Sequence, residues 1–298
     1  MAQTELEIRE PAQLADSAAF PASRTGRLII VRPAPRWPHL DLRELWHYRE
    51  LAGTFVWRDL KVRYRQTFVG IAWALLQPFL SMVVFTLVLG KFGKFPHPGL
   101  QAVPVYILSG LIVWQFFANG LTISSASITS NMNLVTKVYF PRVLIPLAGV
   151  LVPFVDFLLA LLVLAGVCAY YGEPIDGPVW PAPFFVLLAV VTAFGAGLFL
   201  STVNVRYRDV PYAIPFLLQI GMWISTVFVP VSTLSAKQQW IYALSPMNLA
   251  IEGFRWALFD SPAPDVSHAV VSVASAAVLF VLGLWFYRRS EPRFADMI

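Results

Sequence analysis

Residues 57–78, WRDLKVRYRQTFVGIAWALLQP, join a basic run directly to an uncharged run. No Asp, Glu, Lys or Arg occurs from 66 to 90, and the last cations before that stretch are Arg58, Lys61, Arg63 and Arg65. An apolar helix of about 20 residues crosses the roughly 30 Å hydrocarbon core of a bilayer, and flanking Lys and Arg mark the cytoplasmic side. The segment therefore predicts a cationic surface helix that leads into a first membrane span.

The composition indicates a membrane protein. Hydrophobic residues make up 57% of the 298 residues and charged residues 13%, with a mean hydropathy of +0.65. A soluble domain of this length cannot bury that much apolar surface. The net charge of +5 and the pI near 9.4 fit basic cytoplasmic loops better than nucleic-acid binding.

Two further features of the sequence narrow the class of membrane protein. The only cysteine, Cys168, lies in an apolar run, which excludes a disulfide or a thiolate metal site within one chain. The first residues are polar and have no apolar core, so we expect no cleavable signal peptide and a cytoplasmic N-terminus.

The chain divides into three predicted regions: a cytoplasmic tail over 1–38, an interface helix over 39–67 and a transmembrane domain over 68–298. The pair Asp41 and Glu44 has the form of a capping box, which predicts that the interface helix begins near Asp41.

The interface helix is expected to be amphipathic. Leu51, Phe55 and Val62 fall on one helical face and the basic side chains on the adjoining face. Such a helix lies in the membrane interface. It acts either as a headgroup anchor or as a docking surface for another protein, and the pattern alone leaves both open.

Uncharged segments predict an all-α polytopic protein with six transmembrane helices, at 70–90, 103–123, 143–171, 184–203, 213–232 and 266–287. We expect Pro78 to kink the first helix, and Pro146 and Pro153 to bend the third. The Ser, Thr and Asn cluster after 123 is expected to form a loop or a short helix. Gly195, Ala196 and Gly197 predict a close helix contact.

Residues 234–264 are too apolar for an ordinary loop and too polar for a span. Two short re-entrant helices, broken at Ser245 and Pro246 and dipping into the outer leaflet, account for both properties.

The distribution of cations predicts the topology. With six spans and both termini cytoplasmic, the inner side receives 18 Lys and Arg residues and the outer side receives 4. Short cytoplasmic loops are the Lys- and Arg-rich ones, so this topology is favoured.

Candidate catalytic groups are few. Asp156 is the only acid well inside a predicted span, and it is either a functional carboxylate or a hydrogen-bonded structural one. The sequence has no H-E-x-x-H, G-x-S-x-G or phosphate-loop motif. If the protein performs work, an ion gradient or another subunit must supply the energy.

Aromatic side chains recur within three of the predicted spans. They are either interfacial anchors and ordinary packing, or the walls of a channel that stacks on sugar rings. The candidate channel residues are Trp73, Phe79, Phe85, Tyr106, Trp114, Phe117, Trp223 and Phe228.

Five motifs carry a family resemblance: residues 57–78, NLVTKVYFPR at 133–142, VRYRDV at 205–210, SPMNLAIEGFR at 245–255 and the terminal RFADMI. Together they resemble the membrane subunits (permeases) of type-2 ATP-binding-cassette exporters. The resemblance covers about residue 28 to the end and is strongest to the branch that exports O-antigen, capsular polysaccharide and teichoic acid.

The resemblance implies a permease homodimer that forms a channel, with two separate ATPase subunits that bind ATP and Mg on the cytoplasmic face. No cofactor is expected in this chain. The residues that would face the ATPase or the lipid headgroups are Arg58, Asp59, Lys61, Arg63, Arg65, Asn133, Leu134, Lys137, Tyr139, Phe140, Pro141, Arg142, Arg206, Arg208 and Asp209. Each charged residue among them could equally be a solvated loop charge.

The resemblance also implies an outer gate formed by the broken segment, with candidate residues Pro246, Asn248, Glu252 and Arg255, the last two as a possible pair. ATP-driven closure of the partner subunits would shift the interface helix and pass a lipid-linked glycan outward. Two rivals remain: an exporter of a drug or small lipid, and a proton-coupled secondary transporter that uses Asp156.

Overall fold

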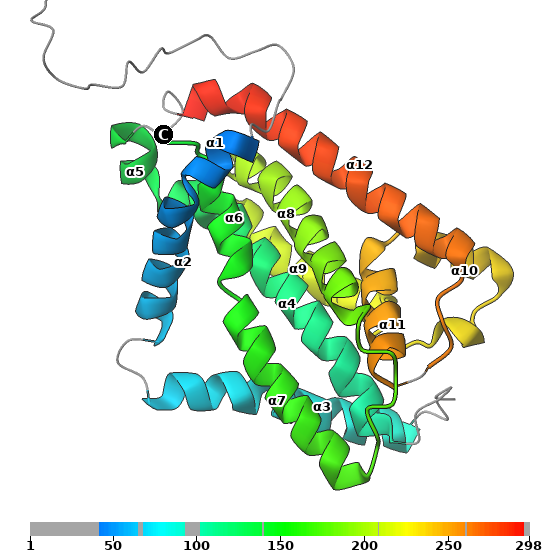
Figure 1. Ribbon diagram of the computed structural model, residues 1–298. Coiled ribbons are helices and arrows are strands. Elements are labelled where there is room, and N and C mark those ends of the chain that lie inside the picture. Colours follow the sequence, from blue (N-terminus) through cyan, green and yellow to red (C-terminus); the bar gives the residue numbers. More distant parts are fainter. Residues whose placement is uncertain are drawn as a thin grey trace, which may run out of the picture. The chain divides into compact units, whose positions relative to one another are not determined.

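The computed structural model describes residues 42–64, 68–92, 102–138, 140–207, 209–259 and 261–294, all within the unit Trp37–Ile298. Every regular element in these ranges is a helix (Figure 1). The α-helices are α1 (Leu42–His47), α2 (Arg49–Tyr64), α3 (Phe68–Phe92), α4 (Val103–Ser130), α5 (Met132–Lys137), α6 (Leu144–Leu151), α7 (Phe154–Tyr171), α8 (Ala182–Arg206), α9 (Val210–Ile224), α10 (Ala236–Ala243), α11 (Pro246–Phe259) and α12 (Val266–Ser290). Two 3₁₀ turns, η1 (Val231–Thr233) and η2 (Glu291–Arg293), complete the set.

Five helical segments are long and apolar enough to cross a membrane: α3, α4, α6 with α7, α8 and α12. The protein is therefore a multi-pass membrane protein. The predicted span at 213–232 corresponds to α9, which is apolar but only 15 residues long.

The helix α9 ends at Ile224, eight residues before the predicted end. The backbone beyond it bonds to another part of the chain: the N–H of Thr226 donates to Oδ1 of Asn248, at 3.1 Å, and the carbonyls of Thr226 and Val227 accept from Arg255. Because these bonds satisfy backbone groups that a helix would otherwise pair, the chain leaves the helix here.

The third predicted span divides into α6 and α7, separated by Val152 and Pro153. The bend predicted at Pro153 is confirmed. The bend predicted at Pro146 was wrong, because this residue lies in the first turn of α6, where its missing N–H breaks no helical hydrogen bond.

The prediction for the Ser- and Thr-rich stretch was also wrong. Instead of leaving the helix after residue 123, the chain continues α4 to Ser130. The hydroxyls donate to carbonyls one turn back, as Ser127 does to Ser124 (2.6 Å) and Thr129 to Ala126 (2.9 Å). Polar side chains that bond to their own helix are compatible with a long span.

The centre of the bundle is α4, which packs against α3, α6, α7, α8, α9 and α11. In the apolar segment of α4, 72% of the residues are buried, against 11% in α3, so α3 is the least buried of the five spanning segments. The predicted close contact at Gly195–Gly197 is confirmed: a Cβ at Gly195 would meet the backbone of Phe280 in α12 at 2.7 Å, and Gly197 lies against Ser124 in α4.

Long-range hydrogen bonds connect segments of different helices at each of the two ends of the bundle. At one end, Asn204 near the end of α8 donates to Thr129 of α4 (3.1 Å), and Arg142 before α6 donates to the carbonyl of Glu291 (2.8 Å). At the other, the N–H of Ala102 donates to Glu173 (2.6 Å) and Ser272 of α12 donates to Ala243 (2.7 Å).

The described part of the predicted interface helix, up to Tyr64, is two helices, α1 and α2, separated by a turn at Tyr48. The predicted start at Asp41 and residues 65–67 lie outside the described residues. Phe55 is buried and contacts Phe140 with ring centroids 5.5 Å apart. Val62, expected on the same apolar face, is 74% exposed, so the apolar stripe is not buried along the whole helix.

The predicted break at Ser245 and Pro246 is confirmed as the boundary between α10 and α11.

Candidate functional site

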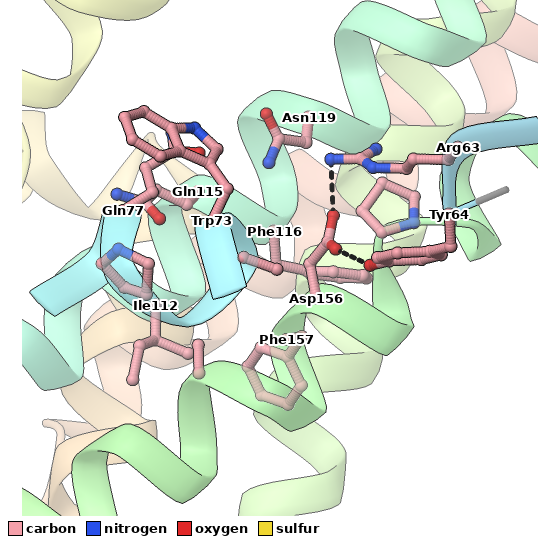
Figure 2. Close-up of a pocket in the computed structure, with 14 residues that line it drawn as sticks. Arg63, Tyr64, Trp73, Gln77, Ile112, Gln115, Phe116, Asn119, Asp156 and Phe157 are labelled. Carbon is pink, nitrogen blue, oxygen red and sulfur yellow. Dashed lines mark hydrogen bonds and ion pairs between the residues drawn. The ribbon is translucent and has the colours of Figure 1, made fainter. Parts of the chain in front are cut away.

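A polar cavity lies between the end of α2 and helices α3, α4 and α7 (Figure 2). One carboxylate oxygen of Asp156, near the start of α7, lies 2.7 Å from Nη2 of Arg63. The other accepts a hydrogen bond from the hydroxyl of Tyr64. The carboxylate thus ties the last turn of α2 to α7, two elements more than 90 residues apart in the sequence.

The hydroxyl of Tyr64 remains a donor over the physiological pH range. Partial burial, and then the hydrogen bond to Asp156, raise the pKa of Tyr64 to about 12.

The remaining polar groups of this cavity are three side-chain amides, Gln77 from α3 and Gln115 and Asn119 from α4, and we call it the amide cavity. Its volume is about 210 Å³. Figure 2 shows the amides grouped near the indole of Trp73, with Phe116 and Phe157 below them.

Local sequence explains why the cavity forms here. Gln115 and Asn119 are four residues apart on α4 and share a helical face. Pro78 lies inside α3 and has no N–H, so the carbonyl of Ala74 loses its usual donor. Both residues line the cavity, together with Pro153 from the break between α6 and α7.

A second charged cluster surrounds Arg255 in α11. Its guanidinium donates to the carbonyls of Thr226 (2.7 Å), Tyr106 (2.9 Å) and Val227 (2.9 Å), and to the hydroxyl of Ser109 (3.3 Å). It also lies 3.6 Å from the ring centroid of Tyr106. Only 2% of the Arg255 side chain is exposed, so the guanidinium is buried.

The other residues of the predicted outer gate surround this cluster. Glu252 lies 3.5 Å from Nη1 of Arg255, so the pair suggested by the sequence is present. Burial raises the pKa of the Glu252 carboxyl, and the neighbouring guanidinium opposes that rise. Asn248 bonds to Thr226 and Tyr242, and Pro246 is buried as the first residue of α11. A cavity of about 250 Å³ lies beside Glu252, between α10, α11 and the start of α12.

The eight predicted channel aromatics separate into buried and exposed groups. Tyr106, Trp114 and Phe117 are buried within the single chain, and the Trp114 ring packs against Gly221 of α9. Phe85, Trp223 and Phe228 form one cluster with centroid distances of 4.7–5.6 Å. The exposed members are Trp73, Phe79 and Trp223, on α3 and α9.

The residues predicted to face an ATPase also differ in exposure. Asn133, Lys137, Arg206, Asp209, Lys61 and Arg63 are exposed, whereas Leu134, Arg58, Asp59 and Arg142 are half-buried and Phe140 and Pro141 are buried. Arg58 pairs with Asp59 at 2.7 Å and donates to Asn131 at 2.8 Å. Arg65, Tyr139 and Arg208 lie outside the described residues.

Within the described ranges, no three or more His, Cys, Asp or Glu side chains come together in a way that could hold a metal ion.

Sequence reasoning missed Tyr64, Gln77, Gln115, Asn119 and Asn131. A signal for the three cavity amides was present, because polar side chains inside uncharged stretches are functional candidates by default. Nothing in the sequence pairs Tyr64 with Asp156 or Asn131 with Arg58, since these partners meet only in the folded chain.

Apolar helices long enough to cross a membrane, packed around a polar cavity, define a multi-pass membrane protein. The description "ABC-2 type transporter" matches residues 50–259, and the chain belongs to that family.

Several bacterial export permeases are similar to this chain. The O-antigen export system permease protein RfbA of Myxococcus xanthus is 27% identical over 262 residues, covering 86% of this chain and 98% of the relative. RfbA of Klebsiella pneumoniae is 26% identical over 242 residues (81% and 92%). The capsule polysaccharide export inner-membrane protein CtrC of Neisseria meningitidis serogroup A is 24% identical over 257 residues (82% and 92%).

Proposed function

We propose that this chain is the permease subunit of an ATP-driven exporter that moves a lipid-linked polysaccharide, such as an O-antigen or a capsular glycan, across the bacterial inner membrane. The observation that carries the proposal is the similarity to O-antigen and capsule export permeases over more than four fifths of the chain. The family match at residues 50–259 includes four of the five motifs, all except the terminal RFADMI.

In this proposal α9 is the sixth span and both termini are cytoplasmic. The end of the bundle that holds α5, Arg206 and the end of α12 then faces the cytoplasm, consistent with the excess of Lys and Arg in those segments. The helices α10 and α11 lie at the outer side as the re-entrant pair.

Two copies of the chain would form the channel. The helices α3 and α9 keep large apolar side chains exposed, among them Trp73, Phe79, Phe216 and Trp223. A second copy that faces these helices would cover much of that surface and place aromatic rings along a path for the glycan.

Two copies of an ABC ATPase subunit, which carries ATP and Mg, would bind the cytoplasmic end. The exposed residues Asn133, Lys137, Arg206 and Asp209 are the proposed contacts. The buried contact between Phe140 and Phe55 connects the segment after α5 to α2, so movement of that segment would move the interface helix.

The test is ATPase activity and association in lipid nanodiscs. The ATPase encoded beside this chain is compared alone and co-purified with it. We expect a two-plus-two complex whose hydrolysis responds to the host glycolipid. Lys137→Glu should weaken association about fivefold, because an exposed charge contact contributes about 1 kcal/mol.

The matched control is Lys237→Glu in α10, an exposed lysine near the opposite end of the bundle, which should leave association unchanged. If no ATPase co-purifies with the wild-type chain, the proposed function is wrong. Equal effects of the two lysine variants would disprove the proposed contact surface.

A further inference from the structure

We propose that the amide cavity binds one uncharged sugar ring of the exported glycan. The proposal rests on the proposed function and adds to it a substrate subsite, formed by the end of α2 with α3, α4 and α7.

The volume of the cavity limits what it can hold. At about 210 Å³ it is smaller than the sites of drug-sized ligands, which span roughly 300–1,000 Å³. A single ring fits this space, whereas a longer oligosaccharide must extend out of it.

The cavity offers hydrogen-bonding groups without internal partners. Gln77, Gln115 and Asn119 make no hydrogen bond with any part of the chain that the structure describes. Each amide has two N–H donors and a carbonyl acceptor, which matches hydroxyl groups that both donate and accept.

An aromatic surface completes the site. Trp73 is 54% exposed and lies beside the amides of Gln77 and Gln115 (Figure 2). The C–H groups on one face of a sugar ring pack against the electron-rich face of an indole. A site with both an aromatic face and several planar amides therefore suits a polyol ring better than a purely apolar ligand.

The charges of the cavity argue against a phosphate. Arg63 and Asp156 are its only charged side chains, and they lie 2.7 Å apart. The lining has no net charge, and an anion near Arg63 would be repelled by the Asp156 carboxylate. The neutral sugar, rather than a charged lipid headgroup, is the favoured occupant.

The experiment measures direct binding to the full chain in nanodiscs by saturation-transfer NMR. The ligands are the methyl glycosides of glucose, galactose, mannose, rhamnose and N-acetylglucosamine, with inorganic pyrophosphate as the anionic alternative. We expect at least one glycoside to bind. Gln115→Leu and Asn119→Leu should each weaken that binding about three- to tenfold, the effect of one lost hydrogen bond.

Three further variants separate binding from folding. Thr122→Val is the matched control, because Thr122 lies on the same helix, is exposed and bonds only to its own helix at Ala118; binding should be unchanged. Trp73→Leu should weaken binding and Trp73→Phe should retain most of it. Since Trp73 is largely exposed, neither change is expected to unfold the protein.

The outcomes are distinguishable from those of the ATPase test. If no glycoside binds, if the amide variants bind as tightly as wild type, or if pyrophosphate displaces the glycoside, the subsite is disproved while a glycolipid-sensitive ATPase complex still stands. If glycoside binding behaves as expected but no ATPase co-purifies, the subsite stands and the exporter assignment fails.

Discussion

Arg255 and Arg63 are each paired with a carboxylate inside the same helical bundle, but their surroundings differ. Arg255 is 2% exposed and donates four hydrogen bonds to protein acceptors in addition to its contact with Glu252. Arg63 is 39% exposed and its pair with Asp156 borders a cavity with three unpartnered amides. Both arginines line a cavity, so exposure and bonding separate them. The buried Arg255, bonded to backbone carbonyls, holds the fold together, whereas the partly exposed Arg63 pair beside unpartnered amides is available to a ligand.

The largest expected effect is at Arg255. Arg255→Leu leaves the carbonyls of Tyr106, Thr226 and Val227 without their donor, and it removes the cation that lies 3.5 Å from the carboxylate of Glu252. Removing one partner of a buried charge pair costs about 3–5 kcal/mol. We expect little folded protein, measured by size-exclusion chromatography after detergent extraction.

Arg255→Lys tests whether the charge or the shape matters. Lysine keeps the charge but has three donors and no planar fork, so it should recover only part of the stability. A fully stable Arg255→Leu variant would contradict the distinction between the structural Arg255 and the partly exposed pair of Arg63 and Asp156.

A much smaller effect is expected at Asp156. Asp156→Asn removes the charge pairing with Arg63 but keeps an oxygen that can accept from Tyr64. Because the pair is partly exposed, we expect a loss of about 1 kcal/mol or less in unfolding free energy. Thermal unfolding in nanodiscs measures the change, and Asp156→Leu, which also removes the acceptor, should be less stable.

The same variant tests the proton-coupled alternative. If Asp156 carried protons, Asp156→Asn would abolish transport. We expect transport, followed as glycan at the cell surface, to be largely retained. Abolished transport in a normally folded variant would return the proton-gradient mechanism to consideration.

The smallest effect concerns Tyr64. A tyrosinate absorbance titration of wild type minus Tyr64→Phe should show one component near pH 12, which shifts to lower pH in Asp156→Asn because the carboxylate helps to raise this pKa. The stability that Tyr64 contributes is present below pH 10 and is lost as pH rises toward 12. A component at pH 10 would mean that the contact with Asp156 does not persist in solution.

Much of the architecture is predictable from local pattern. Charge-free segments predicted the apolar helices, and the bend at Pro153 and the break before Pro246 follow from the missing N–H of proline. The close approach of α8 and α12 follows from Gly195, where the absence of a side chain lets two backbones meet.

The candidate site depends on contacts that no local pattern contains. Gln115 and Asn119 share a face by their spacing, but the sequence does not say that this face meets the end of α2 and the part of α3 around Pro78. The predicted channel residues Tyr106, Trp114 and Phe117 share a face as well, and the structure buries all three. Periodicity identifies a common face without identifying what covers it.

The sequence by itself determined that this is a membrane protein of helices with basic segments at one end, because hydrophobic length and charge distribution act residue by residue. Only the tertiary structure decided where α9 ends, and which arginine is buried and bonded to backbone carbonyls and which is partly exposed. Arg255 lies 149 residues from Tyr106, and Tyr64 lies 92 residues from Asp156. Hydrogen bonds over such separations exist only once the helices have packed.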